Sequence, residues 1–376
     1  MSSAILSLSR RIRSTPFSVR VEELGVQAYT VYNHMLLATS FTSMATDYSH
    51  LCEHVQIWDV SCERQVELRG PDAARLVQLM TPRDMTKIVV GQCVYAPLVD
   101  EAGGMINDPV ILKLAEDRYW ASIADSDALL WAKGLAYGLG LSVEISEPPV
   151  NPVAVQGPKA ETLVARVFGD KVRDIRFFRF AWLPFQGHDF LVARSGWSKQ
   201  GGFEIYVDRD DLALPLWDAL WEAGGDLGVG PGCPNLVERI ESGLLSYGAD
   251  MTRENNPYEC ALDRFCRLDG PDFIGKKALL KIKAEGPARL VRGIKLEGPP
   301  VPPCRESWPI FKGDGEANPI LVGAVNSAVW SPRFEVNIGI AMMERGHWDL
   351  GNQVAVSLLD GTTRQARVCA IPFEDN

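Results

Sequence analysis

Glycine and proline interrupt this sequence at short intervals along its whole length, and this feature constrains the fold most strongly. The 376 residues include 33 Gly and 24 Pro, and no unit repeats with a period of about 20–50 residues, so a solenoid or propeller is excluded. The apolar runs between them are short and bounded by turn formers, as in hairpin-connected strands. We therefore expect an α+β protein with antiparallel sheets rather than alternating βαβ units.

The local patterns predict individual elements. Alternating or β-branched runs predict strands at residues 65–68, 110–114 and 203–207. Periodic apolar residues predict helices at residues 71–80 and 235–247. In the second helix Leu236, Ile240 and Leu244 recur on one face.

The composition changes at about residues 286–320, where Gly, Pro and polar residues cluster. Short strand-like pieces follow at residues 322–324, 338–342 and 353–358. Turn formers separate these pieces, which is typical of small β structures. We therefore expect a small separate C-terminal β domain.

Charge and cysteine content exclude several classes of protein. The chain has 38 basic and 48 acidic residues, a formal charge of −10, which argues against a general nucleic-acid binder. No apolar run approaches the roughly 18 residues that cross a bilayer, so we expect no membrane partner. The eight Cys form no CxxC pair, and scattered thiols favour a reducing compartment. We expect a cytoplasmic location.

The N-terminal stretch, residues 1–21, is rich in arginine and serine and contains no acidic residue. This composition is typical of a mitochondrial transit peptide, and equally of a mature arm whose arginines face solvent or a ligand. Pro16 interrupts any long amphipathic helix, which favours the arm. Its arginines are Arg10, Arg11, Arg13 and Arg20.

Three patterns resemble known motifs without completing them. His50-Leu-Cys-Glu53-His54 matches the HxxEH pattern of zinc peptidases, but no third ligand is evident, and two half-buried helix histidines explain it better. The glycine-rich loop at residues 228–232 lacks the ending of a phosphate-binding loop, so a structural turn is favoured. Residues 196–200 lack the second glycine of GxSxG. We expect no metal site.

Three other stretches concentrate polar residues that suit a reaction centre. Residues 95–110 predict a strand, a Gly-Gly turn and a returning strand that ends in Asn107 and Asp108. Residues 194–206 place Glu204 and Tyr206 two apart on one strand, so their side chains share a face. Residues 238–250 carry Glu238, Arg239 and Glu241 on the predicted helix.

Together these stretches resemble the aminomethyltransferase (glycine-cleavage T-protein) superfamily of tetrahydrofolate enzymes. The matching motifs are Trp58-Asp-Val-Ser61, the Gly-Gly hairpin, the Gly-Phe-Glu strand and the Arg-x-Glu-x-Gly-Leu segment. Within the superfamily the sequence is most similar to the demethylases of dimethylsulfoniopropionate. That similarity lies in residues 9–16, 31–35, 53–58, 193–202, 230–236 and 338–342.

The resemblance implies a three-domain cloverleaf fold, with two interleaved α+β units and a C-terminal, jelly-roll-like β-barrel. The implied domains are residues 1–56 with 146–246, residues 57–145 with 247–285, and residues 286–376. It also implies transfer of a sulfonium methyl group to tetrahydrofolate, which gives 5-methyltetrahydrofolate and 3-methylthiopropionate. The expected partners are two small molecules, the sulfonium substrate and tetrahydrofolate, and a homodimer is left open.

Family positions assign Glu204, Tyr95 and Arg239 to the folate. A carboxylate at Glu204 suits the N–H groups of a pterin ring. Each residue also has a structural alternative. Glu204 could be a solvated strand residue, and Tyr95 an ordinary core tyrosine. Arg239 could form an ion pair on the helix face with Glu241 or a neighbour.

The substrate cation needs aromatic surfaces, because a sulfonium has no hydrogen-bond donor. Tyr32, Trp197 and Tyr206 are the expected aromatic box, and plain packing is the alternative for each. Arg194, Ser195 and Arg20 are candidates for the substrate carboxylate. These candidates form a hypothesis about the site rather than a derivation from spacing.

The expected reaction is a direct in-line attack of folate N5 on the sulfonium methyl, without a covalent enzyme intermediate. Asp108 matches the second Asp of the superfamily hairpin, and either supports the transfer electrostatically or accepts the N5 proton. Tyr206 is expected beside the reacting centre. The first Asp of the hairpin is Asn107 here, which disfavours the main rival, an aminomethyltransferase acting on a lipoyl carrier. A non-enzymatic folate-binding module is the other alternative.

Overall fold

The computed structural model describes residues 9–312 and 319–374, and the chain divides into two units, each built from two segments. Unit 1 comprises residues 1–66 and 147–235, and unit 2 comprises residues 67–146 and 236–376. The first eight residues of the N-terminal arginine-rich stretch and residues 313–318 of the glycine- and proline-rich stretch lie outside the described residues.

Unit 1 contains a six-stranded sheet of order β12-β13-β14-β11-β3-β15 and a separate hairpin, β1-β2. The strands are β1 (Ala28–Tyr32), β2 (Met35–Ser40), β3 (Val55–Asp59), β11 (Asn151–Gln156), β12 (Phe180–Phe185), β13 (His188–Ala193), β14 (Gly202–Val207) and β15 (Val229–Pro231). The helices are α1 (Ser18–Glu23), α2 (Met44–Glu53), α5 (Ala160–Phe168) and α6 (Ala213–Ala223). All sheet neighbours are antiparallel except β15, which runs parallel to β3.

One face of this sheet carries the apolar core of unit 1. Phe203, Ile205 and Val207 of β14 are buried there among side chains of β3, β11, α5 and α6. Because side chains alternate along a strand, Glu204 and Tyr206 lie on the opposite face. Trp58 of β3 lies on that second face too, since Trp58 and Glu204 both pair with Ala154 of β11. The alternation therefore separates a packed face from a polar one.

Unit 2 contains a five-stranded antiparallel sheet of order β10-β4-β9-β8-β5 and the short hairpin β6-β7. The strands are β4 (Gln65–Arg69), whose first two residues belong to unit 1, β5 (Cys93–Tyr95), β6 (Leu98–Val99), β7 (Met105–Asn107), β8 (Val110–Ala115), β9 (Arg118–Ser122) and β10 (Glu144–Ser146). The helices are α3 (Ala73–Met80), α4 (Ala128–Leu139), α7 (Leu236–Glu241) and α8 (Lys276–Glu285). Asp100 closes the β6-β7 turn, because its Oδ1 accepts from the backbone N–H groups of Ala102 and Gly104.

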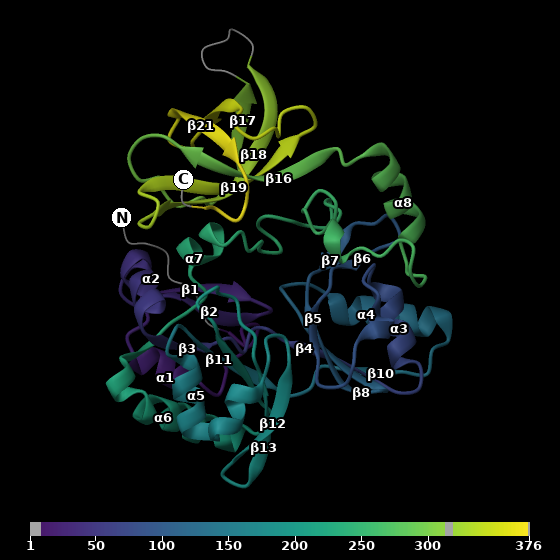
Figure 1. Ribbon diagram of the computed structural model, residues 1–376, viewed down its shortest axis with the longest axis vertical. Helices are drawn as coiled ribbons and strands as arrows, with labels where there is room; N and C mark the ends of the chain where they lie inside the picture. Colours follow the sequence, from purple (N-terminus) through teal and green to yellow (C-terminus); the bar gives the residue numbers. More distant parts are fainter. Residues whose placement is uncertain (1–8, 313–318, 375–376) are drawn as a thin grey trace. The chain divides into compact units, whose positions relative to one another are not determined.

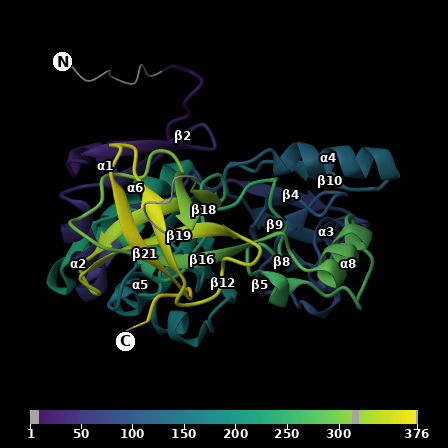
Figure 2. The same ribbon diagram turned by 90° about the horizontal axis from the view of Figure 1, so that it is seen from above.

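The C-terminal part of unit 2 is a closed barrel of order β16-β19-β18-β17-β20-β21. Its strands are β16 (Arg289–Leu296), β17 (Trp308–Lys312), β18 (Ile320–Ser331), β19 (Val336–Glu344), β20 (Gln353–Ser357) and β21 (Thr363–Cys369). The long strands β18 and β19 curve through the barrel wall (Figure 1 and Figure 2), and a cluster of buried aliphatic side chains with Trp308 fills the interior. The α+β class, the antiparallel sheets and the C-terminal barrel are confirmed.

One predicted element differs. The helix expected over residues 235–247 ends at Glu241. The backbone N–H of Phe373, which follows the barrel's last strand, donates to the Glu241 carbonyl oxygen, so a tertiary contact takes an acceptor that a longer helix would use. Among the described residues, none of the helices combines the length and the apolar character that a membrane span requires.

Candidate active site

The polar face of the unit 1 sheet buries Glu204 with almost no exposure. Glu204 is 7% exposed and Tyr206, two residues further along β14, is 1% exposed. The neighbours of Glu204 across the sheet are Ala193 and Ala154. The carboxylate is therefore flanked by small side chains on both neighbouring strands.

Ser195 is the hydrogen-bond partner of Glu204. The Ser195 hydroxyl donates to Oε2 of Glu204, and burial raises the pKa of this carboxyl group. Within the described residues we find no donor to Oε1. A buried carboxylate with an oxygen to spare suits a ligand that presents N–H donors, since such donors stabilise its charged form.

Trp197 lies half-buried in the segment that joins β13 to β14. This segment, residues 195–201, is fixed to the sheet by the side chain of Gln156 at the end of β11. Trp197 and Ser195 therefore belong to one ordered segment that ends where Glu204 begins. The structure brings Ser195, Trp197, Glu204 and Tyr206 to a single strand and the segment that leads into it.

Arg194 is not brought to Glu204. Its guanidinium group forms an ion pair with Glu161 at 2.8 Å and stands 5.4 Å from the ring centroid of Phe203. Phe203 belongs to the apolar core, on the face of the sheet away from Glu204. Of the neighbouring candidates for a carboxylate ligand, Ser195 is therefore on the polar side and Arg194 on the core side.

Two residues of the N-terminal segment have other surroundings. Arg20 binds Asp218 through Nε at 2.7 Å and NH2 at 2.8 Å, and Glu23 through NH1 at 2.7 Å. These partners account for both sides of the guanidinium group. Tyr32 ends β1 and is half-buried, directly before a two-residue turn in which Asn33 and His34 adopt positive φ.

The hairpin of unit 2 presents Asp108 directly after β7. The Tyr95 hydroxyl donates to Oδ2 of Asp108 at 2.9 Å. Burial raises the pKa of Asp108 to about 7, and the hydrogen bond from Tyr95 opposes that rise. A carboxyl group that titrates near neutrality is suited to accept and release a proton. Burial and the nearby Asp108 charge also raise the pKa of Tyr95, so Tyr95 stays a hydrogen-bond donor.

Asn107, which replaces the first Asp of the superfamily pattern, is buried and fully occupied. Its Nδ2 donates to the Ala124 carbonyl at 3.0 Å and to the Ser126 hydroxyl at 2.6 Å. Its Oδ1 accepts from the backbone N–H groups of Asp108 and Ala124. An aspartate could not donate these bonds, so Asn107 holds the end of the hairpin and orients the backbone at Asp108.

Arg239 on α7 lies in a buried cluster with the barrel strand β18. Its NH1 donates to Oδ2 of Asp250 at 2.7 Å, and its NH2 donates to the Ser327 hydroxyl at 2.6 Å. The Ser327 hydroxyl in turn donates to Oδ1 of Asp250 at 2.6 Å. The ion pair that the sequence left open therefore exists, and Asp250 is a partner of Arg239.

The HxxEH histidines lie side by side, with ring centroids 5.0 Å apart. Nδ1 of His54 is 2.9 Å from Nζ of Lys159, and a cation so close opposes binding of a metal ion there. Among the described residues, no group of three or more His, Cys, Asp or Glu side chains is arranged to hold a metal. The glycine-rich loop at 228–232 includes β15, so it is part of the sheet.

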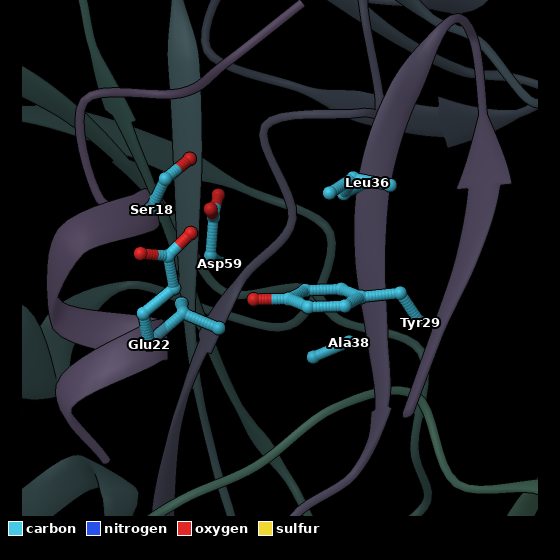
Figure 3. A pocket seen from close by; sticks show the side chains of 7 residues that line it. Ser18, Glu22, Tyr29, Leu36, Ala38 and Asp59 are labelled. Carbon is cyan, nitrogen blue, oxygen red and sulfur yellow. The ribbon is translucent and has the colours of Figure 1, made fainter. Parts of the chain in front are cut away.

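A small cavity of about 20 Å³ lies between α1, β1, β2 and the end of β3, room for about one water molecule. In Figure 3 the Tyr29 hydroxyl points toward the carboxylates of Glu22 and Asp59. Asp59 accepts hydrogen bonds from Thr15 and Ser61 at 2.6 Å each. This cavity is too small for a substrate, and Asp59 of the Trp-Asp-Val-Ser motif serves to tie the N-terminal segment to β3.

Two polar residues near these groups are not evident as functional residues from the sequence. Gln156 is completely buried, and its signal is a glutamine that follows the apolar run at residues 152–155 at the end of a buried strand. The Tyr247 hydroxyl donates to the Met105 carbonyl of β7 at 2.9 Å. Tyr247 lies within the motif at residues 238–250, but its partner is far away in sequence and no local pattern reveals it.

Two interrupted α+β units with antiparallel sheets, a buried strand glutamate, a hairpin aspartate and a terminal barrel define a protein of the glycine cleavage T-protein type. The model of the GCVT N-terminal domain matches residues 17–270. The model of the glycine cleavage T-protein C-terminal barrel domain matches residues 289–375. The chain belongs to this family.

Within the family, the chain is similar to two named relatives and to one solved structure. The chain is 57% identical over 353 residues to dimethylsulfoniopropionate demethylase DmdA of Ruegeria pomeroyi, covering 94% of this chain and 95% of the relative. It is 33% identical to an aminomethyltransferase of Symbiobacterium thermophilum, covering 90% and 91%. The crystal structure of the glycine cleavage system aminomethyltransferase T from Bartonella henselae superposes with a TM-score of 0.85 at 23% identity, covering 96% and 98%. This last likeness concerns the fold.

Proposed function

We propose that this protein is a tetrahydrofolate-dependent demethylase of dimethylsulfoniopropionate, an enzyme that produces 3-methylthiopropionate and 5-methyltetrahydrofolate. The observation that carries the proposal is the 57% identity to a demethylase of that substrate across 94% of the chain. The identity to the aminomethyltransferase of Symbiobacterium thermophilum is 33%. Membership of the family does not by itself distinguish the two reactions, but the higher identity to the demethylase favours demethylation.

Glu204 is the proposed acceptor for the pterin N–H groups. Its carboxylate is buried, and Ser195 holds Oε2 in place. Pterin donors would replace water and offset the burial that raises the pKa of this group. Tyr95 is proposed on the folate side as well, and Arg239 remains a folate candidate whose guanidinium group already binds Asp250 and Ser327.

Trp197, Tyr206 and Tyr32 are the proposed aromatic surfaces for the sulfonium. Each good cation–π contact contributes about 0.5–2 kcal/mol. The box must stay moderate in strength, because positive charge leaves sulfur in the transition state and tight binding of the cation would slow transfer. Ser195 is the candidate for the substrate carboxylate that lies on the polar face of the sheet, whereas Arg194 and Arg20 are engaged by acidic residues.

Tetrahydrofolate supplies the nucleophilic N5, to which the methyl group passes while the electron pair of the broken C–S bond stays on sulfur. The chain's own contribution is to align the two reactants, and positioning of this kind supplies on the order of 7–11 kcal/mol in favourable cases. Asp108 accepts the proton that N5 must lose, and its pKa of about 7 suits that task. Because a thioether leaves readily from a sulfonium, the proposed reaction needs no metal.

The proposed location is the cytoplasm, which the eight free cysteines favour.

The test is turnover by the purified protein. Incubation with dimethylsulfoniopropionate and tetrahydrofolate should produce 3-methylthiopropionate and 5-methyltetrahydrofolate in equal amounts, measured by chromatography. Parallel incubation with an aminomethylated lipoyl carrier protein should give no transfer. Activity with the carrier alone would replace this proposal with the aminomethyltransferase, and folate binding without either activity would indicate a non-enzymatic module.

A further inference from the structure

We propose that Gln156 is a positioning residue of the demethylase, which fixes the segment of residues 195–201 so that Trp197 is held ready for the sulfonium. The inference rests on the proposed function for its substrate and on geometry within unit 1 for its mechanism. Gln156 ends β11, where it pairs in register with Gly202 of β14 on one side and with Gln56 of β3 on the other. Its side chain is 0% exposed.

The amide of Gln156 binds the segment at two points, one on each side of Trp197. Its Nε2 donates to the Ser195 carbonyl oxygen at 3.2 Å. Its Oε1 accepts from the Ser198 hydroxyl at 2.8 Å. One planar amide with both its donor and its acceptor engaged sets the spacing of residues 195 and 198. Trp197 lies between these anchors, so its backbone cannot shift without breaking one of them.

Two glycines make room for this amide. A Cβ atom on Gly196 would lie 2.0 Å from Nε2 of Gln156, and one on Gly202 would lie 2.4 Å from the same atom. Both distances are far below van der Waals contact, so any side chain at either position would displace the amide. The close approach explains why glycine stands at both positions and shows that the segment is packed directly on Gln156.

The same anchor reaches the proposed folate carboxylate. Ser195, whose carbonyl binds Gln156, donates through its hydroxyl to Glu204. Gln156 therefore orders a segment that touches the proposed pterin acceptor at one end and carries the proposed sulfonium surface in the middle. Without the amide, binding of the substrate would have to order Trp197 as well, and that entropic cost would weaken binding.

The test makes the same substitution, glutamine to leucine, at Gln156 and at Gln56, which are both buried and pair in register on neighbouring strands. Gln156→Leu removes both anchors and leaves buried polar groups on the segment unpaired. We expect it to raise KM for dimethylsulfoniopropionate about tenfold, with KM for tetrahydrofolate changed less than about threefold. Gln56→Leu is the matched control, because the Gln56 amide binds the Asp47 carbonyl and the Trp58 indole instead. It should destabilise the protein to a similar degree and leave the substrate KM near the wild-type value.

A milder pair of variants covers the case in which Gln156→Leu fails to fold. Ser198→Ala removes one anchor at a half-buried position, and Gln156→Glu keeps an acceptor for Ser198 while it loses the amide donor to Ser195. Each should raise the substrate KM about threefold, and Gln156→Glu should restore part of the loss seen in Gln156→Leu. If none of the three variants raises the substrate KM, or if Gln56→Leu raises it as much as Gln156→Leu, Gln156 has no positioning role.

A readout without turnover separates this inference from the proposed function. Hydrogen exchange of the free protein should show the amides of residues 196–201 losing protection in Gln156→Leu and keeping it in Gln56→Leu. Suppose that exchange is faster in Gln156→Leu but the wild-type protein is inactive on dimethylsulfoniopropionate. The positioning role of Gln156 would then stand, and the proposed function would be wrong. Unchanged exchange with wild-type activity present would overturn the anchor and leave the function standing.

Discussion

The phenolic oxygen of Tyr95 lies 2.9 Å from Oδ2 of Asp108 and donates a hydrogen bond to it. Burial of Asp108 and this hydrogen bond act in opposite directions, since burial raises the pKa of the carboxyl group and the bond lowers it. The result is a pKa of about 7, and a proton acceptor with such a pKa works best near neutral pH. The pair thus joins a carboxyl group whose pKa suits a base to the hydroxyl group that lowers that pKa.

The first prediction is a pH-dependent rate that this pair controls. Because only ionised Asp108 accepts a proton, kcat should rise with pH and level off above a midpoint near 7. Tyr95→Phe removes the bond that favours the charged form, so the midpoint should move to higher pH. Tyr137→Phe, at a tyrosine that is 92% exposed, is the control and should leave the profile in place. A rate profile with the same midpoint in Tyr95→Phe would remove Tyr95 from this role.

The second prediction concerns stability and carries the opposite sign. The pKa of Asp108 is raised from 3.8 to about 7, so the folded state binds more protons than the unfolded state between these values. The free energy of unfolding therefore falls as pH rises through this window. Asp108→Asn keeps the shape and removes the charge, so at about pH 8 it should stabilise the protein by on the order of 2 kcal/mol, and at about pH 4 by little.

Urea unfolding at the two pH values measures this difference, and Asp84→Asn provides a control, because hydrogen bonds lower rather than raise the pKa of Asp84. The same Asp108→Asn protein should lose most of its turnover, about 100-fold if the carboxylate acts as a base. If Asp108→Asn changes the free energy of unfolding equally at both pH values, ionisation of the buried Asp108 does not destabilise the folded protein.

The third prediction tests the aromatic surface at Trp197. Loss of a cation–π contact worth about 0.5–2 kcal/mol corresponds to a rise in KM of about 2- to 30-fold for Trp197→Ala, with Trp197→Phe near the lower end. Trp182→Ala is the matched control, since Trp182 lies on β12 and is 43% exposed. Binding of the product 3-methylthiopropionate, whose sulfur carries no charge, should weaken less than binding of the sulfonium substrate when both are followed by calorimetry. Equal losses for cation and product would point to packing alone.

The sequence predicted those parts of the fold that depend on local pattern. The strand that carries Glu204 and Tyr206 and the hairpin before Asp108 are present as expected. Both follow from alternation and turn chemistry, which a few neighbouring residues determine. A small C-terminal β domain likewise followed from a change in composition and the short strand patterns after it, whereas its closure into a barrel was implied by the resemblance to the family.

The rest depended on partners far away in sequence. Arg194 and Ser195 are adjacent in sequence, but their side chains lie on opposite faces of the sheet. Arg194 forms an ion pair with Glu161, whereas Ser195 donates a hydrogen bond to Glu204. The anchoring role of Gln156 requires contacts with residues about forty positions later, and no local pattern contains them. The end of α7 was missed for the same reason, since the partner of the Glu241 carbonyl is Phe373.

The final prediction decides between the two roles that remain for Arg239. The side chain of Arg239 is 8% exposed and that of its partner Asp250 is 0% exposed. Arg239→Met would leave the Asp250 charge buried and unpaired, so we expect a loss of about 3–5 kcal/mol in the free energy of unfolding. Asp250→Leu in the same chain removes that charge and should recover most of the loss.

Urea unfolding of the two variants and their KM for tetrahydrofolate separate the cases. A structural ion pair predicts a large loss of stability in Arg239→Met, recovery in the double variant, and a KM for tetrahydrofolate in the double variant that stays near the wild-type value. A folate ligand predicts the reverse, because the second substitution cannot restore a lost contact with the cofactor. Since both NH groups already bind Asp250 and Ser327, we expect the first result.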